Sequence, residues 1–500
     1  MCLETATNAH VSGDPKANFA FNAEAHGEPP LVVDVDGTLL RTDLLVESFI
    51  RLLMVQPLEA LKAPYWLSAG KSHLKAQIAN RVGLDIETLP LEPTVLSLVQ
   101  KERTRGRRVI LASASERRYV EALAARIGLT EPVFATDQGC NLSGSCKRDA
   151  LVAAFGEGGF DYIGDSRADR PVWRAARRSY VMRSALGDPT RGLASDRMPE
   201  MVTRSRSTPR SLAFALRVHQ WVKNLLVFVP LILGGAIGDS SAVLKALSCF
   251  VAFCVLASST YLINDLLDVA NDRRHPSKRH RPLASGALHP APAVGLALLG
   301  MLIGLGIGAA TSWPVLFGLA GYVALTMAYS LRLKRVPIVD AVTLGGLYTW
   351  RLFVGVLAAG VTFSAWLMVF SFAFFLSLAL AKRQAEITNM VTANRTELAG
   401  RGYRTCDAPF VMNMGVAAGM SSILIFILYL IEGAFRAAYF SAPTVLWVCP
   451  AILLLWISRV WMLAGRGELH EDPVEFAIKD PKSSILAAIA AAAILTAMLA

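Results

Sequence analysis

Apolar residues are distributed unevenly along the 500-residue chain. Up to about residue 210 they alternate with polar residues over short stretches, as in a water-soluble domain. From Leu212 onward they form long runs that match the length a helix needs to cross about 30 Å of hydrocarbon. We predict nine membrane-spanning helices in this second part, at residues 222–239, 242–263, 291–310, 313–330, 338–358, 363–381, 409–431, 442–463 and 483–499.

Short β-rich segments alternate with helical stretches between residues 31 and 183. Four of them indicate buried strands of a parallel sheet, namely "LVVDVDG", "RRVILAS", "FDYIGD" and "SYVMR". Between the first two lies a stretch with helical periodicity, from Leu44 to Gln100. We expect it to be a helical insertion over the carboxyl edge of the sheet, where open α/β folds bind ligands. The predicted fold class is an α/β domain with a helical cap, followed by an all-α membrane bundle.

Composition marks the boundary between these two parts. Residues 184–210 are rich in Pro, Gly, Ser and Arg and show no periodicity, which is typical of a linker. The expected organisation is an N-terminal extension over 1–30, a soluble domain over 31–183 with its cap at about 44–100, the linker, and a membrane domain over 211–500.

The loop charges predict the orientation of the membrane domain. The chain begins with neither a basic segment nor a continuous apolar core, so we expect no cleaved signal peptide and a cytoplasmic soluble domain. The loops after spans two, four, six and eight then face the cytoplasm, whereas the opposite loops carry only Lys245 and Arg436. The cytoplasmic loops hold Arg273, Arg274, Lys278, Arg279, Arg281, Arg332, Lys334, Arg335, Lys382, Arg383, Arg395, Arg401, Arg404, Arg466, Lys479 and Lys482. We therefore expect a multi-pass protein of the inner (cytoplasmic) membrane, with its polar motifs on the cytoplasmic side.

The net charge of +11 has two candidate explanations. No Lys/Arg patch interleaved with aromatic residues occurs outside the membrane loops, so we expect no nucleic-acid partner. An anionic bilayer and phosphorylated substrates explain the charge better. The seven cysteines form no CxxC pair and no metal-ligand spacing, so we expect them to be reduced and structural. The oligomeric state stays open, a homo-oligomer included.

Two carboxylates follow the first predicted strand in "VVDVDGTL". Asp34 and Asp36 are separated by one residue and precede a Gly-Thr turn. Such a pair can divide the labour of phosphoryl transfer, because one carboxylate attacks phosphorus while the other protonates the leaving oxygen and later activates water. Acids that end a strand also cap helices, so the pair alone leaves both interpretations open.

Three further motifs follow in order, and with them the segment resembles the haloacid dehalogenase (HAD) phosphohydrolases, a Rossmann-like α/β family. They are Ser113 in "VILAS", Lys147 in "CKRDAL", and Asp165 with Asp169 in "YIGDSRAD". The resemblance implies Asp34 as nucleophile, Asp36 as general acid/base, Ser113 as a phosphate contact and Lys147 as the neutralising cation. It also implies Mg²⁺ held by Asp34, the backbone of Asp36, and the Asp165/Asp169 pair. A retained fold without turnover is the alternative.

A second acidic motif lies at the end of the second predicted span. In "NDLLDVAND", Asn264, Asp268 and Asp272 are four residues apart, so a continuous helix would stack them on one face, with Asp265 beside them. Oxygen ligands at this spacing suit Mg²⁺ carrying a diphosphate. The following "RRHPSKRHRP" supplies cations for the same anion: Arg273, Lys278, Arg279 and Arg281. A helix end that merely reaches water would suit one acid better than a spaced series.

This pattern resembles the UbiA-type prenyltransferase superfamily. The stretches "RVHQWVKN", "HPSKRHRPLASG", "YSLRLKRVPIVD", "AKRQAE" and "DPVEFAIKD" are similar to the branch that contains decaprenyl-phosphate phosphoribosyltransferases. UbiA enzymes normally carry a second aspartate-rich motif after span six, whereas this chain has "AKRQAEITNM" with Lys382, Arg383 and Glu386. That loop favours a donor and an acceptor that are both phosphorylated.

The resemblance implies Mg²⁺-dependent transfer of a 5-phosphoribosyl group from phosphoribosyl pyrophosphate to a polyprenyl phosphate, with the attached hydrolase removing a phosphomonoester. That monoester could be the 5-phosphate of the lipid product. The remaining substrate-binding candidates are Lys223, Asn224, Tyr329, Arg332 and Lys334. Two alternatives stay open: an aromatic prenyltransferase that uses a polyprenyl diphosphate, and a lipid-binding or transport protein with a regulatory phosphatase domain.

Overall fold

The computed structural model describes residues 28–137, 141–182, 188–191, 199–202, 209–275, 277–392, 401–436, 440–469, 476–477 and 479–499. The chain divides into two compact units. The first unit comprises residues 1–212 and 265–292, and the second comprises residues 213–264 and 293–500. Residues 1–27 of the expected N-terminal extension lie outside the described residues.

The first unit contains a six-stranded sheet in which all neighbouring strands are parallel, in the order β3-β2-β1-β4-β5-β6. The four predicted strands are confirmed as β1 (Leu31–Val33), β2 (Val109–Glu116), β4 (Asp161–Gly164) and β5 (Ser179–Met182). The two edge strands were not predicted: β3 (Phe134–Thr136) and β6 (Glu200–Val202). Strand β6 comes from the segment that we expected to be a linker.

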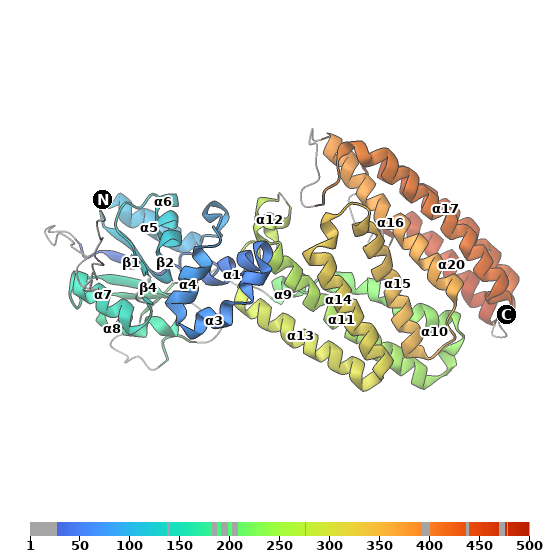
Figure 1. Cartoon of the computed structure of the whole chain (residues 1–500), viewed down its shortest axis with the longest axis horizontal. Coiled ribbons are helices and arrows are strands. Elements are labelled where there is room, and N and C mark those ends of the chain that lie inside the picture. Colours follow the sequence, from blue (N-terminus) through green and yellow to red (C-terminus); the bar gives the residue numbers. More distant parts are fainter. Residues whose placement is uncertain are drawn as a thin grey trace, which may run out of the picture. The chain divides into compact units, whose positions relative to one another are not determined.

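Helices cover both faces of this sheet. The neighbouring β1 residues Val32 and Val33 belong to different hydrophobic cores, because successive side chains of a strand point to opposite faces. Figure 1 shows two helices on either side of the strands, which are α5 (Pro93–Thr104) and α6 (Arg117–Arg126) on one face and α7 (Ser145–Phe155) and α8 (Arg170–Ala175) on the other. With both faces covered, the carboxyl edge is where polar side chains can gather.

The stretch from Leu44 to Gln100 is helical, as predicted, but it is not a single insertion. Its first four helices enclose a small core around Leu52, Trp66 and Ile78. They are α1 (Leu44–Val55), α2 (Pro57–Ala60), α3 (Ala63–Ser68) and α4 (Lys71–Ala79). Helix α5 packs differently, since Val95 and Val99 enter a core of the sheet. The inserted part therefore ends before α5.

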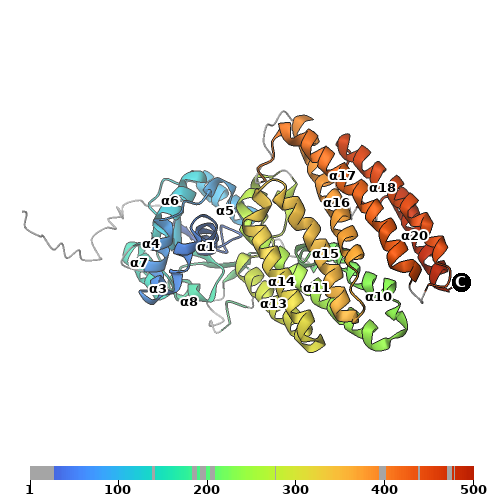
Figure 2. The same ribbon diagram turned by 45° about the vertical axis from the view of Figure 1, so that its right-hand side comes forward.

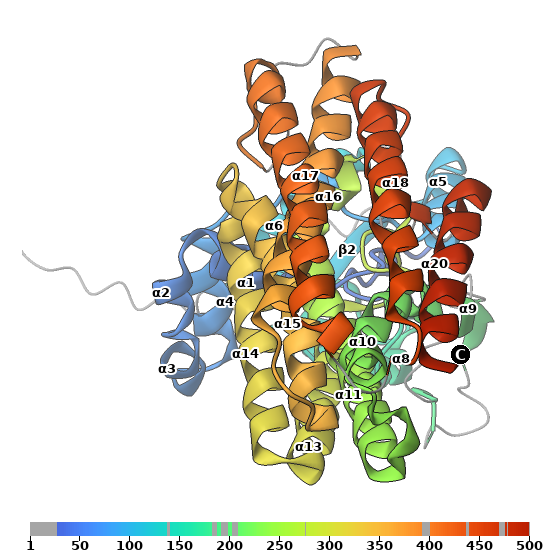
Figure 3. The same cartoon turned by 90° about the vertical axis from the view of Figure 1, so that its right-hand side faces the viewer.

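Eight helices among the described residues are long and apolar enough to cross a membrane, so the chain is a multi-pass membrane protein. They are α11 (Ser240–Leu267), α13 (Pro290–Thr311), α14 (Trp313–Leu331), α15 (Val339–Ala359), α16 (Ala365–Thr392), α17 (Ala408–Glu432), α18 (Val448–Gly465) and α20 (Pro481–Leu499). Figure 2 shows α13 and α14 as a neighbouring pair, and Figure 3 shows α16, α17, α18 and α20 running alongside one another.

The prediction of nine transmembrane helices is not confirmed. The first expected span is a shorter apolar helix, Val218–Leu233. It combines a 3₁₀ helix, η4 (Val218–Phe228), with the five-residue α10 (Val229–Leu233). The chain then turns at Gly234 and Gly235, and Gly235 has a φ of 69°. Hydropathy detects the apolar composition of this stretch but not the break in the helix.

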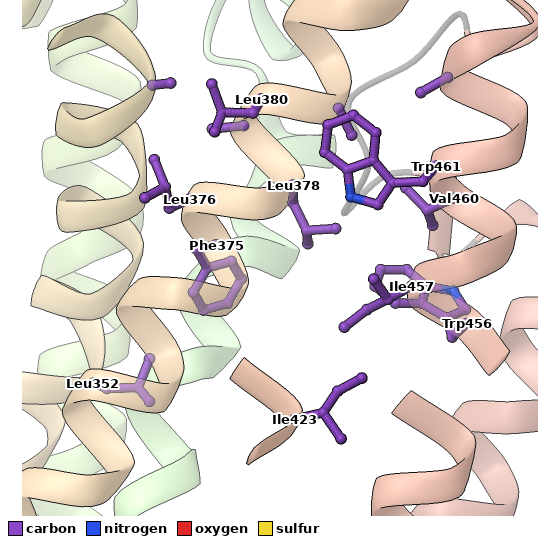
Figure 4. Close-up of a cluster of buried hydrophobic side chains, with 14 of the residues drawn as sticks. Leu352, Phe375, Leu376, Leu378, Leu380, Ile423, Trp456, Ile457, Val460 and Trp461 are labelled. Carbon is purple, nitrogen blue, oxygen red and sulfur yellow. The ribbon is translucent and has the colours of Figure 1, made fainter. Parts of the chain in front are cut away.

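Close contacts between α16, α17 and α18 organise the core of the second unit. Figure 4 shows Trp461 and Ile457 of α18 facing α16. A Cβ on Gly415 would overlap the Trp461 ring, so only glycine permits this approach. Ser377 fixes the junction, because its hydroxyl donates to Gly415 O at 2.7 Å and accepts from Trp461 Nε1 at 2.9 Å. These contacts hold the second half of the bundle together.

The sequence led us to expect reduced, structural cysteines. The cysteines within the described part of the chain are free: Cys146, Cys249, Cys254, Cys406 and Cys449. Cys2 and Cys140 lie outside it.

Candidate active sites

The carboxyl edge of the sheet brings together the side chains of the first acidic motif. Asp34 directly follows β1, and Lys147 of α7 donates to Asp34 Oδ1 at 2.7 Å. Lys147 also lies 3.3 Å from Asp169 Oδ1, which accepts a 2.6 Å hydrogen bond from Tyr162 Oη. The Ser166 amide and hydroxyl donate to the other oxygen of Asp169 at 3.1 and 2.8 Å. Lys147 thus lies between two buried carboxylates.

Burial and charge pairing set the protonation states of this group. Burial raises the pKa of Asp34 to about 7, and the neighbouring Lys147 ammonium opposes that rise. Burial would lower the pKa of Lys147, but Asp34 and Asp169 outweigh it and raise the pKa, so Lys147 stays charged. Burial would likewise raise the pKa of Asp169. The charge of Lys147 and the hydrogen bonds that Asp169 accepts from Tyr162 and Ser166 instead hold this pKa below its usual range. A positive charge therefore persists where a phosphoryl group would need one.

Asp36 is held by three donors from other parts of the domain. The backbone amide of Leu44 donates to Asp36 Oδ1 at 2.8 Å. The hydroxyls of Ser113 and Ser115 donate to Oδ2 at 3.0 and 2.6 Å. Ser113, predicted as a phosphate contact, is fully buried and also accepts from the Ser115 amide at 2.9 Å. Ser115 was not predicted, although its position two residues after Ser113 places both on one face of β2.

Three carboxylates form a cluster that fits a divalent ion. Ligand oxygens of Asp34, Asp165 and Asp169 all lie within 4.8 Å of one another. Hard carboxylate oxygens are the ligands that Mg²⁺ prefers. The turn after β1 also approaches Asp165 closely, because a Cβ on Gly37 would overlap the Asp165 carboxylate. The residues present therefore fit the predicted metal.

The helical insertion contributes two ionisable groups that the sequence did not single out. Lys75 of α4 donates to Ala114 O at 2.5 Å and to Asn141 Oδ1 at 2.7 Å. Burial lowers the pKa of Lys75, while the negative charges of Asp36 and Asp43 oppose that change. Burial and then the charge of Asp36 raise the pKa of Asp43 to about 6. The inserted helices thus place a second cation beside the carboxylate site.

The second acidic motif departs from its predicted geometry. Helix α11 ends at Leu267, and Asp268 has φ −93° and ψ 1° before α12 (Val269–Arg274) begins. The expectation that Asn264, Asp268 and Asp272 stack on one continuous helix is therefore wrong, although the Asp272 amide still donates to Asp268 O at 2.9 Å. The helix is interrupted at Asp268, between α11 and α12.

Arg281 pairs with two acids of this motif. Its Nη1 lies 3.1 Å from Asp265 Oδ1 and 2.6 Å from Asp272 Oδ2, and both carboxylates are buried. Burial raises the pKa of Asp272, and Arg281 opposes that shift. One arginine thus bridges two acids that are seven residues apart in sequence.

The other cations of this segment are placed differently. The Arg273 guanidinium donates to Glu47 and to Ala284 O rather than to an acid of the motif. Lys278 and Arg279 lie on a short 3₁₀ helix, η6 (Lys278–His280), where Arg279 is exposed. In the second unit, Lys334 Nζ donates to Asn264 Oδ1 at 3.3 Å, while Arg332 is exposed at the end of α14.

The segment that replaces the usual second aspartate motif was expected to be a loop, but it is the last part of helix α16. It takes part in a charge-balanced cluster. Arg383 is buried, its Nε lies 2.9 Å from Asp340 Oδ2, and it also pairs with Glu386. Arg401 Nη1 lies 3.5 Å from Asp340 and 3.4 Å from Tyr329 Oη, and Tyr403 Oη donates to Asp340 Oδ1 at 2.5 Å. Arg383, Glu386 and Tyr329 thus come together, but around Asp340, Arg401 and Tyr403, which were not predicted as site residues. Lys382 lies half-buried next to this group.

A further polar network lies inside the second unit. Asn224 is buried and accepts from Arg351 Nε at 3.0 Å. Arg351 also donates to Leu347 O at 2.7 Å and to Tyr322 Oη at 2.9 Å. Lys223 is buried, with its ammonium 5.8 Å from the centre of the Tyr348 ring. Arg351 was not predicted, although a lone arginine within the apolar run "YTWRLF" is costly enough to be a signal.

Comparison with known proteins identifies two families in the chain. The UbiA prenyltransferase family profile matches residues 225–477, half of the chain. The protein belongs to the UbiA prenyltransferase family. A profile described as haloacid dehalogenase-like hydrolase matches residues 31–174, so a HAD-type domain precedes the UbiA domain.

Three relatives match this chain over different shares of its length. The uncharacterized protein y4nM of Sinorhizobium fredii is 36% identical over 94% of this chain and 91% of its own length. The nodulation protein NoeC of Azorhizobium caulinodans is 35% identical over 54% of this chain and 88% of its own. A decaprenyl-phosphate phosphoribosyltransferase of Mycobacterium tuberculosis is 31% identical over 55% of this chain and 89% of its own. The similarity to y4nM extends over almost the whole two-domain length.

Proposed function

We propose that the UbiA domain is a Mg²⁺-dependent transferase that moves a 5-phosphoribosyl group from phosphoribosyl pyrophosphate to a polyprenyl phosphate. The observation that carries this proposal is the arrangement of Asp265, Arg281 and Asp272. It offers carboxylates for a metal and a guanidinium for a diphosphate within one cluster. The name of the mycobacterial relative supports the choice of donor and acceptor.

The reaction requires no protein base. The bond between the anomeric carbon and the diphosphate oxygen breaks, and its electron pair leaves with diphosphate. An oxygen of the lipid phosphate forms the new bond to that carbon, and this oxygen is already anionic. Asn264, Asp265, Asp268 and Asp272 would hold the Mg²⁺, which supplies charge that offsets the leaving group.

The placement of the cations limits which side chains could bind the lipid phosphate and the ribose 5-phosphate. Arg383 and Arg401 are balanced by Asp340 and Glu386, so these four side chains carry no net charge. Lys382, half-buried next to these side chains, is a candidate ligand for the lipid phosphate or the ribose 5-phosphate. Lys334, whose ammonium donates to Asn264 Oδ1, is the candidate phosphate ligand beside the acidic motif.

A donor competition assay tests the transferase proposal. Membranes containing the protein should release diphosphate from phosphoribosyl pyrophosphate when Mg²⁺ and polyprenyl phosphate are both present. The variant Asp272→Asn should lose this activity, and Lys245→Gln, an exposed substitution near the start of α11, should retain it. Transfer from polyprenyl diphosphate to a hydroxybenzoate would instead identify an aromatic prenyltransferase. A lipid-binding or transport protein would release no diphosphate from either donor.

We further propose that the HAD domain hydrolyses a phosphomonoester, with the 5-phosphate of the lipid product as its substrate. Asp34 attacks phosphorus, the bond to the ester oxygen breaks, and Asp36 gives that oxygen its proton. Water then attacks the aspartyl phosphate, Asp36 takes the water proton, and Asp34 is regenerated with release of phosphate. Mg²⁺ held by Asp34 and Asp165 would offset the charge on the phosphoryl oxygens, and Lys147 contributes in the same way.

The helical insertion α1 to α4 is proposed to act as a cap on this site. Lys75 supports this role, because it extends from α4 to atoms at the end of β2. A cap of this kind would select substrates through contacts beyond the phosphate. The substitution Lys75→Gln should therefore change the KM for a bulky phosphomonoester more than it changes the inhibition constant of inorganic phosphate.

We propose that Val218–Leu233 crosses the membrane despite its shortness, which keeps the HAD domain and the acidic motif on the cytoplasmic side. A 3₁₀ helix rises about 2.0 Å per residue. The eleven residues of η4 and five of α10 therefore extend over about 30 Å, close to the hydrocarbon thickness. A single cysteine at Asp239, the exposed residue before α11, should react with an impermeant thiol reagent from the outside, and one at Arg279 only after permeabilisation. The reverse pattern, or equal reactivity, would overturn this topology.

A further inference from the structure

A buried ion pair joins the segment of the second acidic motif to the helical insertion within the first compact unit. Arg273 follows Asp272 on α12, and Glu47 lies in the first turn of α1. Nη2 of Arg273 donates to Glu47 Oε1 at 2.6 Å, and Nη1 donates to Oε2 at 3.2 Å. The two side chains are only 5% and 4% exposed. This fork of two hydrogen bonds fixes the carboxylate in distance and in orientation.

Glu47 is in turn tied to the start of α1. The Thr42 hydroxyl donates to Glu47 Oε1 at 2.5 Å, and the Glu47 amide donates to Asp43 O at 3.0 Å. Asp43 caps the same helix, because its side chain accepts from the Val46 amide at 2.9 Å. The first turn of α1 thus has its position fixed by Arg273 on one side and by the cap on the other.

The first amide of α1 contacts the HAD site itself. Leu44, the first residue of the helix, donates its backbone N–H to Asp36 Oδ1 at 2.8 Å. An N–H at a helix N-terminus favours a carboxylate and fixes its orientation. Any shift of the first turn of α1 therefore moves a donor that holds Asp36. Glu47 and Leu44 are three residues apart, so they belong to the same turn.

A buried ion pair is a weak source of net stability, because both charges lose their hydration. The more specific contribution of this pair is that it fixes the position of the Glu47 carboxylate. We propose that Arg273 is a positioning residue for Asp36, so that leaving-group protonation in the HAD domain depends on the segment that carries the transferase motif. This inference rests on the proposed phosphatase function, and it gives Arg273 a role other than the phosphate contact expected from the sequence.

Leaving-group chemistry separates this role from a general loss of structure. The full-length protein in detergent is assayed with glycerol 2-phosphate, whose alkoxide needs a proton to leave, and with p-nitrophenyl phosphate, whose phenolate leaves readily. The variant Arg273→Gln should lower kcat for glycerol 2-phosphate by about ten- to a hundredfold, with little change in KM. Its kcat for p-nitrophenyl phosphate should change much less.

Arg274→Gln is the matched control. Arg274 is the adjacent residue, and it pairs with Asp85 while 67% of its side chain is exposed. This variant should behave like the wild type with both substrates. Arg273→Lys keeps the charge but lacks the planar fork, so it should recover only part of the lost rate. It also serves as the test variant if Arg273→Gln does not fold.

The outcomes are distinct. If the wild type hydrolyses neither ester, the phosphatase proposal itself is wrong. If the wild type is active and Arg273→Gln matches Arg274→Gln on both esters, or slows both esters equally, Arg273 does not position the general acid. A loss confined to the poor leaving group supports the inference. In that case Glu47→Gln should show the same selectivity, and the double variant should be no worse than the more impaired single variant.

Discussion

Lys147 Nζ lies 2.7 Å from Asp34 Oδ1, and both side chains are buried at the carboxyl edge of the sheet. The pair places a fixed positive charge beside the proposed nucleophile. Lys147→Met should therefore reduce kcat/KM for p-nitrophenyl phosphate by about a hundred- to a thousandfold, because a charge that stabilises the transferring phosphoryl group is lost.

Lys101→Gln is the control for this substitution, since Lys101 is exposed at the end of α5. Its activity should equal that of the wild type. A Lys147→Met protein that keeps wild-type kcat/KM would mean that hydrolysis does not take place at Asp34.

Gly37 allows the turn after β1 to approach Asp165. It has a φ of 78°, and an added Cβ would overlap the Asp165 carboxylate. Gly37→Ala should raise the Mg²⁺ concentration needed for half-maximal hydrolysis by about tenfold or more, because a proposed metal ligand must move.

Gly106→Ala is the control that separates the effect of backbone strain from the effect of displacing Asp165, the proposed Mg²⁺ ligand. Gly106 has a φ of 79°, but an added Cβ would meet nothing within 4 Å. It should lower stability by about 1 kcal/mol and leave the Mg²⁺ requirement unchanged. Equal Mg²⁺ requirements in the two variants would argue against Asp165 as a ligand.

The juxtaposition of Asp34 and Asp165 was accessible from sequence because the parallel strands that they follow, β1 and β4, are neighbours and end at the same edge. Motifs that follow such strands must meet. Ser115 and Lys75 were missed. The spacing of two residues from Ser113 was the available signal for Ser115. The contacts of Lys75 depend on how α4 packs, which leaves no spacing pattern in the sequence.

Asp161 gives the first unit a defined dependence on acid pH. Burial would raise the pKa of Asp161, but hydrogen bonds from Arg177 and Arg107 outweigh burial and hold the pKa below its usual range. The Arg177 bonds measure 2.9 and 2.8 Å. A depressed carboxyl pKa contributes stability above its unfolded value of about 3.9, and that contribution is lost as pH falls through the folded-state value.

Asp161→Asn should therefore destabilise the first unit by about 3 kcal/mol at neutral pH and make its stability less dependent on pH in the acid range. Urea unfolding monitored by hydrogen exchange of peptides from residues 141–182 measures this. Asp149→Asn, an exposed acid on α7, should keep both stability and pH dependence. An Asp161→Asn protein with an unchanged acid profile would contradict the assignment.

The membrane domain was less predictable than the HAD domain. Asp340 lies inside the quoted stretch "YSLRLKRVPIVD", yet its role depends on Arg383 and Tyr403, which come from distant positions. The break after Leu233 follows from Gly234 and Gly235, which an apolar average does not register. Hydropathy was enough to predict most of the long helices. The polar partners inside the bundle could be identified only from the folded structure.

Asp340 balances the charge of Arg383 in the second unit. Asp340→Asn leaves the buried guanidinium without its main counter-charge, so it should destabilise the protein by about 3 to 5 kcal/mol. Thermal unfolding in detergent measures this as a large drop in Tm. Arg335→Gln, an exposed change on a neighbouring segment, should leave Tm as it is. An Asp340→Asn protein as stable as the wild type would mean that the cluster around Arg383 has no structural role.

The two sites are proposed to act in sequence on one lipid, and mass spectrometry of lipid products tests this most directly. Membranes that contain the protein are supplied with Mg²⁺, phosphoribosyl pyrophosphate and polyprenyl phosphate. The wild type should form the dephosphorylated polyprenyl-phosphoryl ribose, Asp34→Asn should accumulate the form that keeps its 5-phosphate, and Asp272→Asn should form neither. An unchanged ratio of the two lipids in Asp34→Asn would contradict the account.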